Sequence, residues 1–187
     1  MNDICLMKKF ISILRGINVS GQKKILMKDL KELFEKLHLK QVQTYIQSGN
    51  VVFESDTEFT NSKLAIIIET AIEKEFHFHV PIIIRSKEEL KKIISLNPFI
   101  KDESIDLKKL HVTFLSEIPT KENAESIVNN DFSPDQFAIN GKNIFLHIPK
   151  SYGETKLSNS FFEKKLKVAA TTRNWNTVNK LLEMASN

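Results

Sequence analysis

The hydrophobic pattern of this chain predicts the same order of strands and helices twice, and that order restricts the fold more than any other feature. In the first half, short apolar and β-branched runs predict four strands, and apolar residues at helical spacing predict two helices. The strands are expected at 8–15, 42–47, 51–54 and 80–85, and the helices at 27–37 and 61–76. The resulting order, β-α-β-β-α-β, is that of the ferredoxin-like plait.

The order begins again after a polar helix, 87–96, and a charged stretch, 101–109, that is expected to be a linker or loop. Strands are predicted at 110–115, 136–139, 143–148 and 168–173, and helices at 121–129, 158–166 and 174–185. We therefore expect an α+β protein with two ferredoxin-like plaits in tandem and a closing C-terminal helix. The expected division is a first domain, 1–86, a helix and linker, 87–109, and a second domain, 110–187.

The predicted hairpins of the two halves resemble each other in sequence, S-G-N-V-V-F at 48–53 and N-G-K-N-I-F at 140–145. Six residues are too few to establish a duplication, so the predicted repeat rests on the order of the elements. The first strand is apolar on both faces, with Ile11 and Ile13 alternating with Phe10 and Leu14. A strand of this kind is covered on both sides, and we expect the other domain to cover its second face.

Cysteine content and hydropathy exclude several classes of protein. The 187 residues contain one cysteine, Cys5, in a segment expected to be frayed, so there is no disulfide framework or multi-cysteine metal site. The spacing of the five histidines predicts no metal site, and no motif predicts a cofactor.

No run approaches the roughly 20 apolar residues that span a bilayer, and the first residues lack the order of a signal peptide. We expect a cytoplasmic protein without a membrane partner.

The net charge of +4 hides an uneven distribution. Residues 1–54 carry +4, residues 55–140 carry −5, and residues 141–187 carry +5. If the two basic ends meet in space, they form a positive surface that attracts an anion. The alternative is that most of these lysines occupy the solvated faces of amphipathic helices.

The loop after the first strand carries glycines and basic residues together. It reads G-I-N-V-S-G-Q-K-K from Gly16 to Lys24 and follows Arg15. A strand followed by G-x-x-x-x-G resembles a phosphate-binding P-loop, but Gln22 stands where that motif needs lysine, and no serine or threonine follows. We expect a looser anion-binding loop with Arg15, Asn18, Lys23 and Lys24 as candidate ligands; the alternative is a loop that needs glycine only for its turns.

A second candidate site is the segment T-T-R-N, which precedes the closing helix. Thr172 or Asn174 is expected to cap that helix, whose first N–H groups favour negative charge. Arg173 beside them would bind a carboxylate or phosphate with its forked guanidinium group. Thr171, Thr172, Arg173 and Asn174 are therefore candidate ligands; alternatively, Arg173 pairs with a carboxylate or carbonyl and the others only cap.

The first predicted hairpin gathers polar side chains that form a third candidate. Alternation along the strand places Tyr45 and Gln47 on one face, and Ser48 and Asn50 follow in the turn. Tyr45, Ser48 and Asn50 are candidates to line a ligand surface. The alternative is turn chemistry, in which Ser48 and Asn50 bond to nearby backbone.

Several sequence blocks resemble a bacterial family catalogued as domain of unknown function 1697. The blocks are L-R-G-I-N-V at 14–19, T-Y-I-Q-S-G-N-V-V-F at 44–53, N-P-F at 97–99, H-V-T-F-L at 111–115 and T-T-R-N-W-N-T-V at 171–178. The family pattern usually has a second glycine after G-I-N-V, where this chain has Ser20 before Gly21. The resemblance implies two ferredoxin-like domains in a stand-alone cytoplasmic protein, and it implies no activity.

Together these features predict a binding module for an anionic ligand, either a phosphorylated or acidic small molecule or the backbone of a nucleic acid. This prediction requires the loop 14–24 and the segment 171–174 to approach each other. One alternative is an enzyme of unknown reaction with a polar cleft around Tyr45, Asn50 and Arg173. Another is a homo-oligomeric structural protein that associates through sheet edges or apolar faces. The fold does not distinguish these alternatives, because plaits serve all three.

Overall fold

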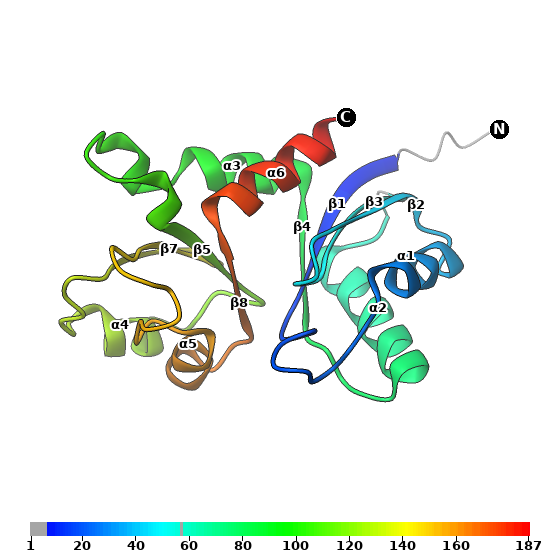
Figure 1. Cartoon of the computed structure of the whole chain (residues 1–187), viewed down its shortest axis with the longest axis horizontal. Helices are drawn as coiled ribbons and strands as arrows, with labels where there is room; N and C mark the ends of the chain where they lie inside the picture. The colour runs from blue at the N-terminus through cyan, green and yellow to red at the C-terminus, as the bar shows by residue number, and fades with distance from the viewer. Residues whose placement is uncertain (1–6, 57) are drawn as a thin grey trace. The chain divides into compact units, whose positions relative to one another are not determined.

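The computed structural model describes residues 7–56 and 58–187, and these form an α+β fold with six α-helices and two four-stranded antiparallel sheets (Figure 1). The chain divides into two compact units. The first contains the residues up to Lys91 together with Leu181–Asn187, and the second contains Lys92–Lys180. Each unit is described by itself below. The domain boundaries expected from the sequence stay a prediction.

The first unit contains one sheet in the strand order β2-β3-β1-β4, in which every neighbouring pair is antiparallel. Its elements are β1 (Met7–Leu14), α1 (Met27–Lys36), β2 (Lys40–Tyr45), β3 (Asn50–Asp56), α2 (Asn61–Phe76) and β4 (Ile82–Ser86), followed by α3 (Lys87–Ser95). Thr60 begins α2 by accepting a hydrogen bond from the Lys63 N–H through its hydroxyl. Each element that the hydrophobic pattern predicts in this half is present.

One face of this sheet packs against α1 and α2 and forms a core (Figure 1). Phe53 lies at its centre, with the Phe34 ring 5.5 Å away edge-on and the Phe10 ring 5.9 Å away. On the opposite face of β1, Ile11 and Ile13 are also buried, as its apolar pattern predicts.

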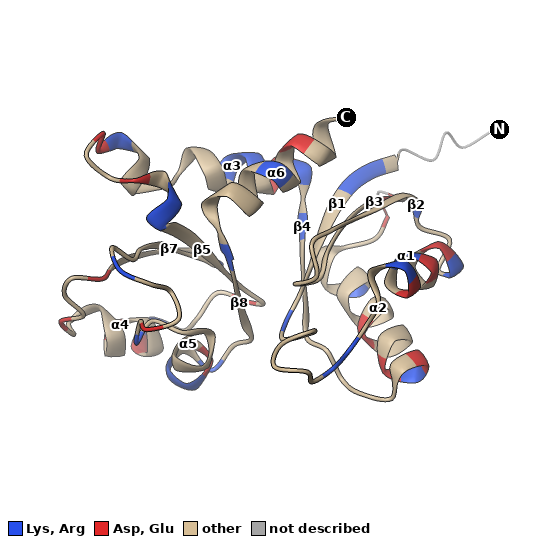
Figure 2. Cartoon of the chain, viewed as in Figure 1, with Lys and Arg blue, Asp and Glu red and all other residues tan. Residues whose placement is uncertain are grey.

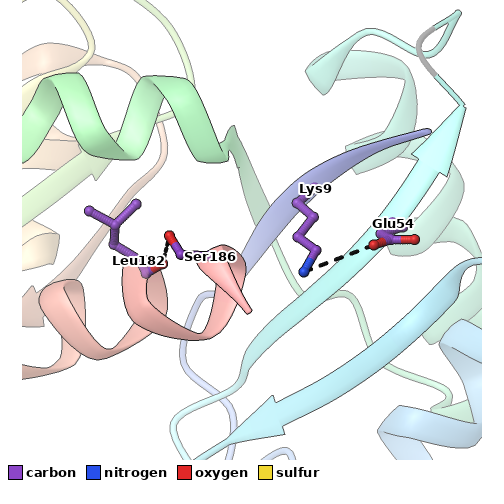
Figure 3. A network of polar contacts seen from close by, with 4 residues as sticks. All are labelled: Lys9, Glu54, Leu182 and Ser186. Carbon is purple, nitrogen blue, oxygen red and sulfur yellow. Dashed lines mark hydrogen bonds and ion pairs between the residues drawn. The ribbon is translucent and has the colours of Figure 1, made fainter. Parts of the chain in front are cut away.

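Two polar contacts of the first unit are seen in Figure 3. Lys9 and Glu54 oppose each other across β1 and β3 and form an ion pair of 3.9 Å. The Ser186 hydroxyl donates to the Leu182 carbonyl, 2.8 Å away, in the last turn of the C-terminal helix.

The second unit repeats the strand order as β6-β7-β5-β8, again antiparallel throughout. Its elements are β5 (Leu110–Leu115), α4 (Lys121–Val128), β6 (Gln136–Asn140), β7 (Asn143–His147), α5 (Asn159–Leu166) and β8 (Ala170–Asn174). The last helix, α6 (Trp175–Ser186), begins in this unit and ends in the first. A core around Leu146, Phe162 and Leu166 fills one face of the sheet.

The charged stretch and the end of the second strand differ from the sequence-based predictions. The charged stretch expected to be a linker or loop contains a 3₁₀ turn, Leu107–Lys109, and another 3₁₀ turn, Pro98–Lys101, ends at its start. The second strand ends at Tyr45, because Ile46 adopts a left-handed backbone with φ 49°. Gln47 therefore lies in the turn and does not share a strand face with Tyr45. The prediction for Cys5 falls outside the described residues.

The register shows how closely the two sheets correspond. In the first sheet, Ile11 on β1 stands between Val52 on β3 and Arg85 on β4. In the second, Val112 on β5 stands between Phe145 on β7 and Arg173 on β8. Arg85 on β4 and Arg173 on β8 therefore occupy equivalent positions in the two sheets.

The hairpin resemblance noted in the sequence does not follow this register. By strand pairing, Asn50 corresponds to Asn143, since each opens the third strand of its sheet. The resemblance pairs Phe53 with Phe145, which is one residue out of step. Phe53 belongs to the core beneath the helices, whereas Ile144 and Leu146, the neighbours of Phe145, belong to that core in the second unit. A slip of one residue reverses the face of a strand, so this resemblance is not evidence of duplication.

Candidate functional site

The loop between β1 and α1 is a small ordered hairpin rather than an open loop. Val19 and Gln22 form an isolated antiparallel bridge, and the Asn18 N–H donates to the Lys23 carbonyl. Ser20 (φ 49°) and Gly21 (φ 75°) both have left-handed backbone, the pattern of a two-residue type I′ turn. The hairpin carries Lys23 on its returning arm, and Lys24 follows directly; both are exposed.

The side-chain amide of Asn18 fastens this hairpin to the rest of the unit. Its Oδ1 accepts from the Ile25 N–H, and its Nδ2 donates to the Ile25 and Gln47 carbonyls, each at 2.9 Å. Asn18 has φ 55°, a conformation that asparagine tolerates better than most residues. Its amide therefore supports the hairpin through backbone contacts.

The turn between β2 and β3 supports the same region. Asn50 is fully buried, and its Nδ2 donates to the Tyr45 carbonyl at 3.0 Å and to the Ser48 hydroxyl at 3.1 Å. These are the turn bonds that the sequence offered as the alternative to a ligand surface. Gly49 (φ 80°) lies against Leu14, whose N–H donates to the Gly49 carbonyl.

Two hydrogen bonds bring a third loop to this end of the first sheet. The Arg15 N–H donates to the Pro81 carbonyl at 2.9 Å, and the Lys23 ammonium group donates to the His79 carbonyl at 2.7 Å. We call the joined loops the basic loop cluster: residues 15–25, 45–50 and 77–81.

The charge of the basic loop cluster has one sign. Asp and Glu are absent from the three stretches of sequence that contain its loops, 10–28, 36–53 and 76–87. Figure 2 shows basic residues and no acidic ones along the loop from β1 to α1. Arg15, Lys23 and Lys24 supply positive charge, and the exposed His77 and His79 lie on the third loop. An anion that reaches this cluster meets no carboxylate on its loops.

The candidate ligand residues of the second unit form hydrogen bonds with one another and with the backbone next to them. Arg173 is 8% exposed, and its Nη1 donates to the Thr171 hydroxyl at 3.0 Å and to the Thr172 carbonyl at 2.9 Å. Asn174 caps α6 by accepting from the Thr177 N–H at 2.8 Å, so Asn174 and not Thr172 is the cap. These contacts agree with the alternative reading for Arg173, in which it pairs with a carbonyl.

The eleven candidate residues thus fall into two sets. Arg15, Asn18, Lys23, Lys24, Tyr45, Ser48 and Asn50 lie around the basic loop cluster of the first unit, whereas Thr171, Thr172, Arg173 and Asn174 lie on β8 of the second. The expectation that the two sets meet stays a prediction.

Comparison with known proteins supplies a family. Residues 7–145 match the family described as Protein of unknown function (DUF1697). The chain belongs to the DUF1697 family. The resemblance predicted from its sequence blocks is thereby confirmed. The DUF1697 match contains the whole basic loop cluster and ends before Thr171.

A solved structure extends the likeness of this DUF1697 chain to its full length. It is that of conserved bacterial protein SP0830 from Streptococcus pneumoniae, with a TM-score of 0.73 and 22% sequence identity. The likeness covers 96% of this chain and 99% of that chain, and at this identity it concerns the fold. No curated protein matches the chain.

Ser20 has the backbone conformation of a glycine in this turn of the DUF1697 chain. Its φ of 49° lies in the left-handed region that glycine favours. The type I′ turn needs this conformation at both central positions, and Gly21 supplies the second with φ 75°.

Sequence reasoning on this DUF1697 chain missed Arg85. It is 5% exposed, and its Nη1 donates to the carbonyl of the preceding residue, Ile84, at 2.9 Å. Arg173 makes the same bond to Thr172. Burial lowers the pKa of Arg85 to about 10, and the nearby Glu89 carboxylate opposes this change. Only the register of the two sheets relates the two arginines, because their surrounding sequences differ.

Neither a metal cluster nor a membrane helix occurs in the described part of this DUF1697 chain. Among residues 7–56 and 58–187, no three His, Cys, Asp or Glu side chains are grouped so as to hold a metal ion. None of the helices found there is long and apolar enough to cross a membrane.

A chain of hydroxyls beside Arg173 yields a test of this region of the DUF1697 protein. The Thr172 hydroxyl donates to Asn159 Oδ1 at 2.7 Å, so the buried Thr113 hydroxyl, 2.7 Å away, must donate to Thr172. Thr172→Val removes the acceptor of Thr113 and the donor to Asn159, and we expect it to lower the free energy of unfolding by about 1–2 kcal/mol. Thr113→Val removes one donor only and should have the smaller effect in urea unfolding. The reverse ranking would contradict this donor assignment.

Proposed function

We propose that the protein binds an anionic, phosphate-bearing ligand at the basic loop cluster of its first unit. The observation that carries the proposal is that three loops without a carboxylate meet, and that the first of them bears Arg15, Lys23 and Lys24. Phosphate is the anion that suits lysine as a point charge and flexible glycine backbone as a close neighbour.

Lys23 and Lys24 are the residues on which the proposal rests. A lysine ammonium group has three N–H donors, and the His79 carbonyl accepts one of those of Lys23. That bond holds the Lys23 side chain over the third loop and leaves donor capacity for a ligand. Lys24 is exposed beside it. Asn18, Ser48 and Asn50 act as positioning residues, because their side chains bond within the loops.

Pyrophosphate binding measured by calorimetry tests the proposal. Lys24→Glu should weaken binding at least tenfold, because a hydrogen bond to a charged group contributes about 1.5–3 kcal/mol. Lys165→Glu makes the same charge change at an exposed lysine of α5 and should leave affinity within twofold. Equal losses in both variants, or no pyrophosphate binding by the wild type, would overturn the proposal.

A ten-nucleotide RNA separates the two kinds of phosphate ligand. If the nucleic-acid backbone is bound, log K should fall with log salt by about 0.7 for each phosphate contacted. If a small phosphorylated molecule is bound, pyrophosphate should bind while the RNA does not.

The same proposal includes the finer fold assignment. We infer that each unit is a ferredoxin-like plait and that the two are separate domains of a bacterial, cytoplasmic protein. The element order β-α-β-β-α-β and the strand orders β2-β3-β1-β4 and β6-β7-β5-β8 support the plait.

A further inference from the structure

We propose that the ligand of the basic loop cluster is a phosphate monoester with a hydrocarbon group, and that the hydrocarbon lies on Val19, Leu26 and Ile46. This inference rests on the proposed function, because the lysines of that site hold the phosphate. It adds the chemical class of the rest of the ligand.

The three aliphatic side chains are exposed around the same hairpin. Val19 is 58% exposed, Leu26 71% and Ile46 48%. Val19 follows Asn18 directly, and the Asn18 amide bonds the backbone of Ile25 and Gln47, which adjoin Leu26 and Ile46. The contacts of one side chain therefore join the three backbone segments that carry Val19, Leu26 and Ile46, and the first of these segments also carries Lys23 and Lys24.

Ile46 gives the strongest indication that this apolar surface has a use. Its backbone is left-handed, with φ 49°. Among the described residues with positive φ, it is the only one with a β-branched side chain. A β-branched side chain in this conformation is a true outlier, and such strain persists mainly at functional sites. Burial does not compensate for it, because almost half of the side chain is exposed. Asparagine or glycine would fill the turn without that strain.

Charge and apolar surface together match an amphiphilic anion. The lysine side chains attract the phosphate, and aliphatic side chains gain free energy when they cover a hydrocarbon. We commit to a single dissolved molecule and not to a bilayer, because stable attachment to a membrane needs a larger apolar anchor or a polybasic patch. Two adjacent lysines and three aliphatic side chains suffice for one ligand molecule.

Methyl phosphate and hexyl phosphate, titrated into the full chain by calorimetry, test the inference. Hexyl phosphate should bind at least tenfold more tightly, because covering two methylene groups alone accounts for about that factor. Ile46→Asn should reduce this preference at least threefold, although relief of the left-handed strain should make the variant at least as stable as the wild type. Ile66→Asn, at an isoleucine 63% exposed on α2, should leave the preference unchanged.

The possible failures are distinguishable. Equal affinity for methyl and hexyl phosphate in the wild type would overturn this inference and leave the phosphate site standing. A preference for hexyl phosphate that Ile46→Asn and Ile66→Asn both preserve would overturn the assignment to this surface. Binding to vesicles with phosphatidic acid, without binding of hexyl phosphate, would overturn the commitment to a dissolved ligand. If neither monoester binds but pyrophosphate does, this inference fails and the phosphate site stands. If none of the three compounds binds, this inference and the proposed function both fail.

Discussion

Replacing Gly49 by alanine is expected to lower the free energy of unfolding by about 3–5 kcal/mol, through left-handed strain and overpacking together. A Cβ at this position would lie 2.7 Å from Ile17 Cδ1 and 2.8 Å from Leu14 Cβ. The first atom ends a flexible side chain, but the second is fixed to the backbone of β1. Because the Leu14 N–H also donates to the Gly49 carbonyl, strand and turn must separate to admit the methyl group. Urea unfolding followed by circular dichroism measures the loss.

Gly141→Ala is the matched control for Gly49→Ala. Gly141 also has a left-handed backbone, with φ 57°, but a Cβ there has no atom within 4 Å. Gly141→Ala therefore tests backbone strain alone, and we expect it to lower the free energy of unfolding by about 1 kcal/mol. Equal losses at the two glycines would show that the turn does not press against β1, and the described support of the basic loop cluster would then be wrong.

Replacing Asn18 by alanine should lower the free energy of unfolding by about 3 kcal/mol, because three hydrogen bonds are lost and a left-handed residue is strained. The side chain joins the hairpin to Ile25 and to the turn at Gln47. The variant should also weaken pyrophosphate binding, since Lys23 and Lys24 follow on the released arm. Calorimetry and urea unfolding measure the two effects.

Asn18→Gly separates the two causes. Glycine adopts φ 55° without strain, so this variant loses only the side-chain bonds, and about 2 kcal/mol of the effect should remain. If Asn18→Gly were as stable as the wild type, the three amide bonds would contribute nothing. Asn18 would then be available as a direct ligand, as the sequence suggested.

Residue periodicity predicts the elements of this fold well because it reports burial directly. Leu110–Leu115, predicted as a strand from its apolar run, has these same bounds in the structure. Periodicity does not report pairing between strands. Nothing in the local sequence of Arg85 and Arg173 indicates that they are equivalent, since their correspondence depends on the register with Ile11 and Val112.

The candidate site, like the fold, could be predicted from the sequence only in part. Glycines and lysines in the sequence predict a basic loop after the first strand, and Lys23 and Lys24 are exposed there. The sequence does not distinguish a side chain that binds a ligand from one that binds the backbone, because both uses favour asparagine and serine. Asn18, Ser48 and Asn50 therefore become positioning residues only when their hydrogen bonds are seen. Ile46 is exposed because β2 ends one residue before it, at Tyr45. Its apolar side chain instead predicted that the strand continues through it.

Backbone amide chemical shifts during a pyrophosphate titration test the central claim most directly, because they report where the ligand binds and not only whether it binds. We expect the largest shifts at Gly21, Lys23 and Lys24, with smaller shifts at residues 45–50 and 77–81. Shifts confined to other parts of the chain, or none at saturating pyrophosphate, would contradict a phosphate site at the basic loop cluster.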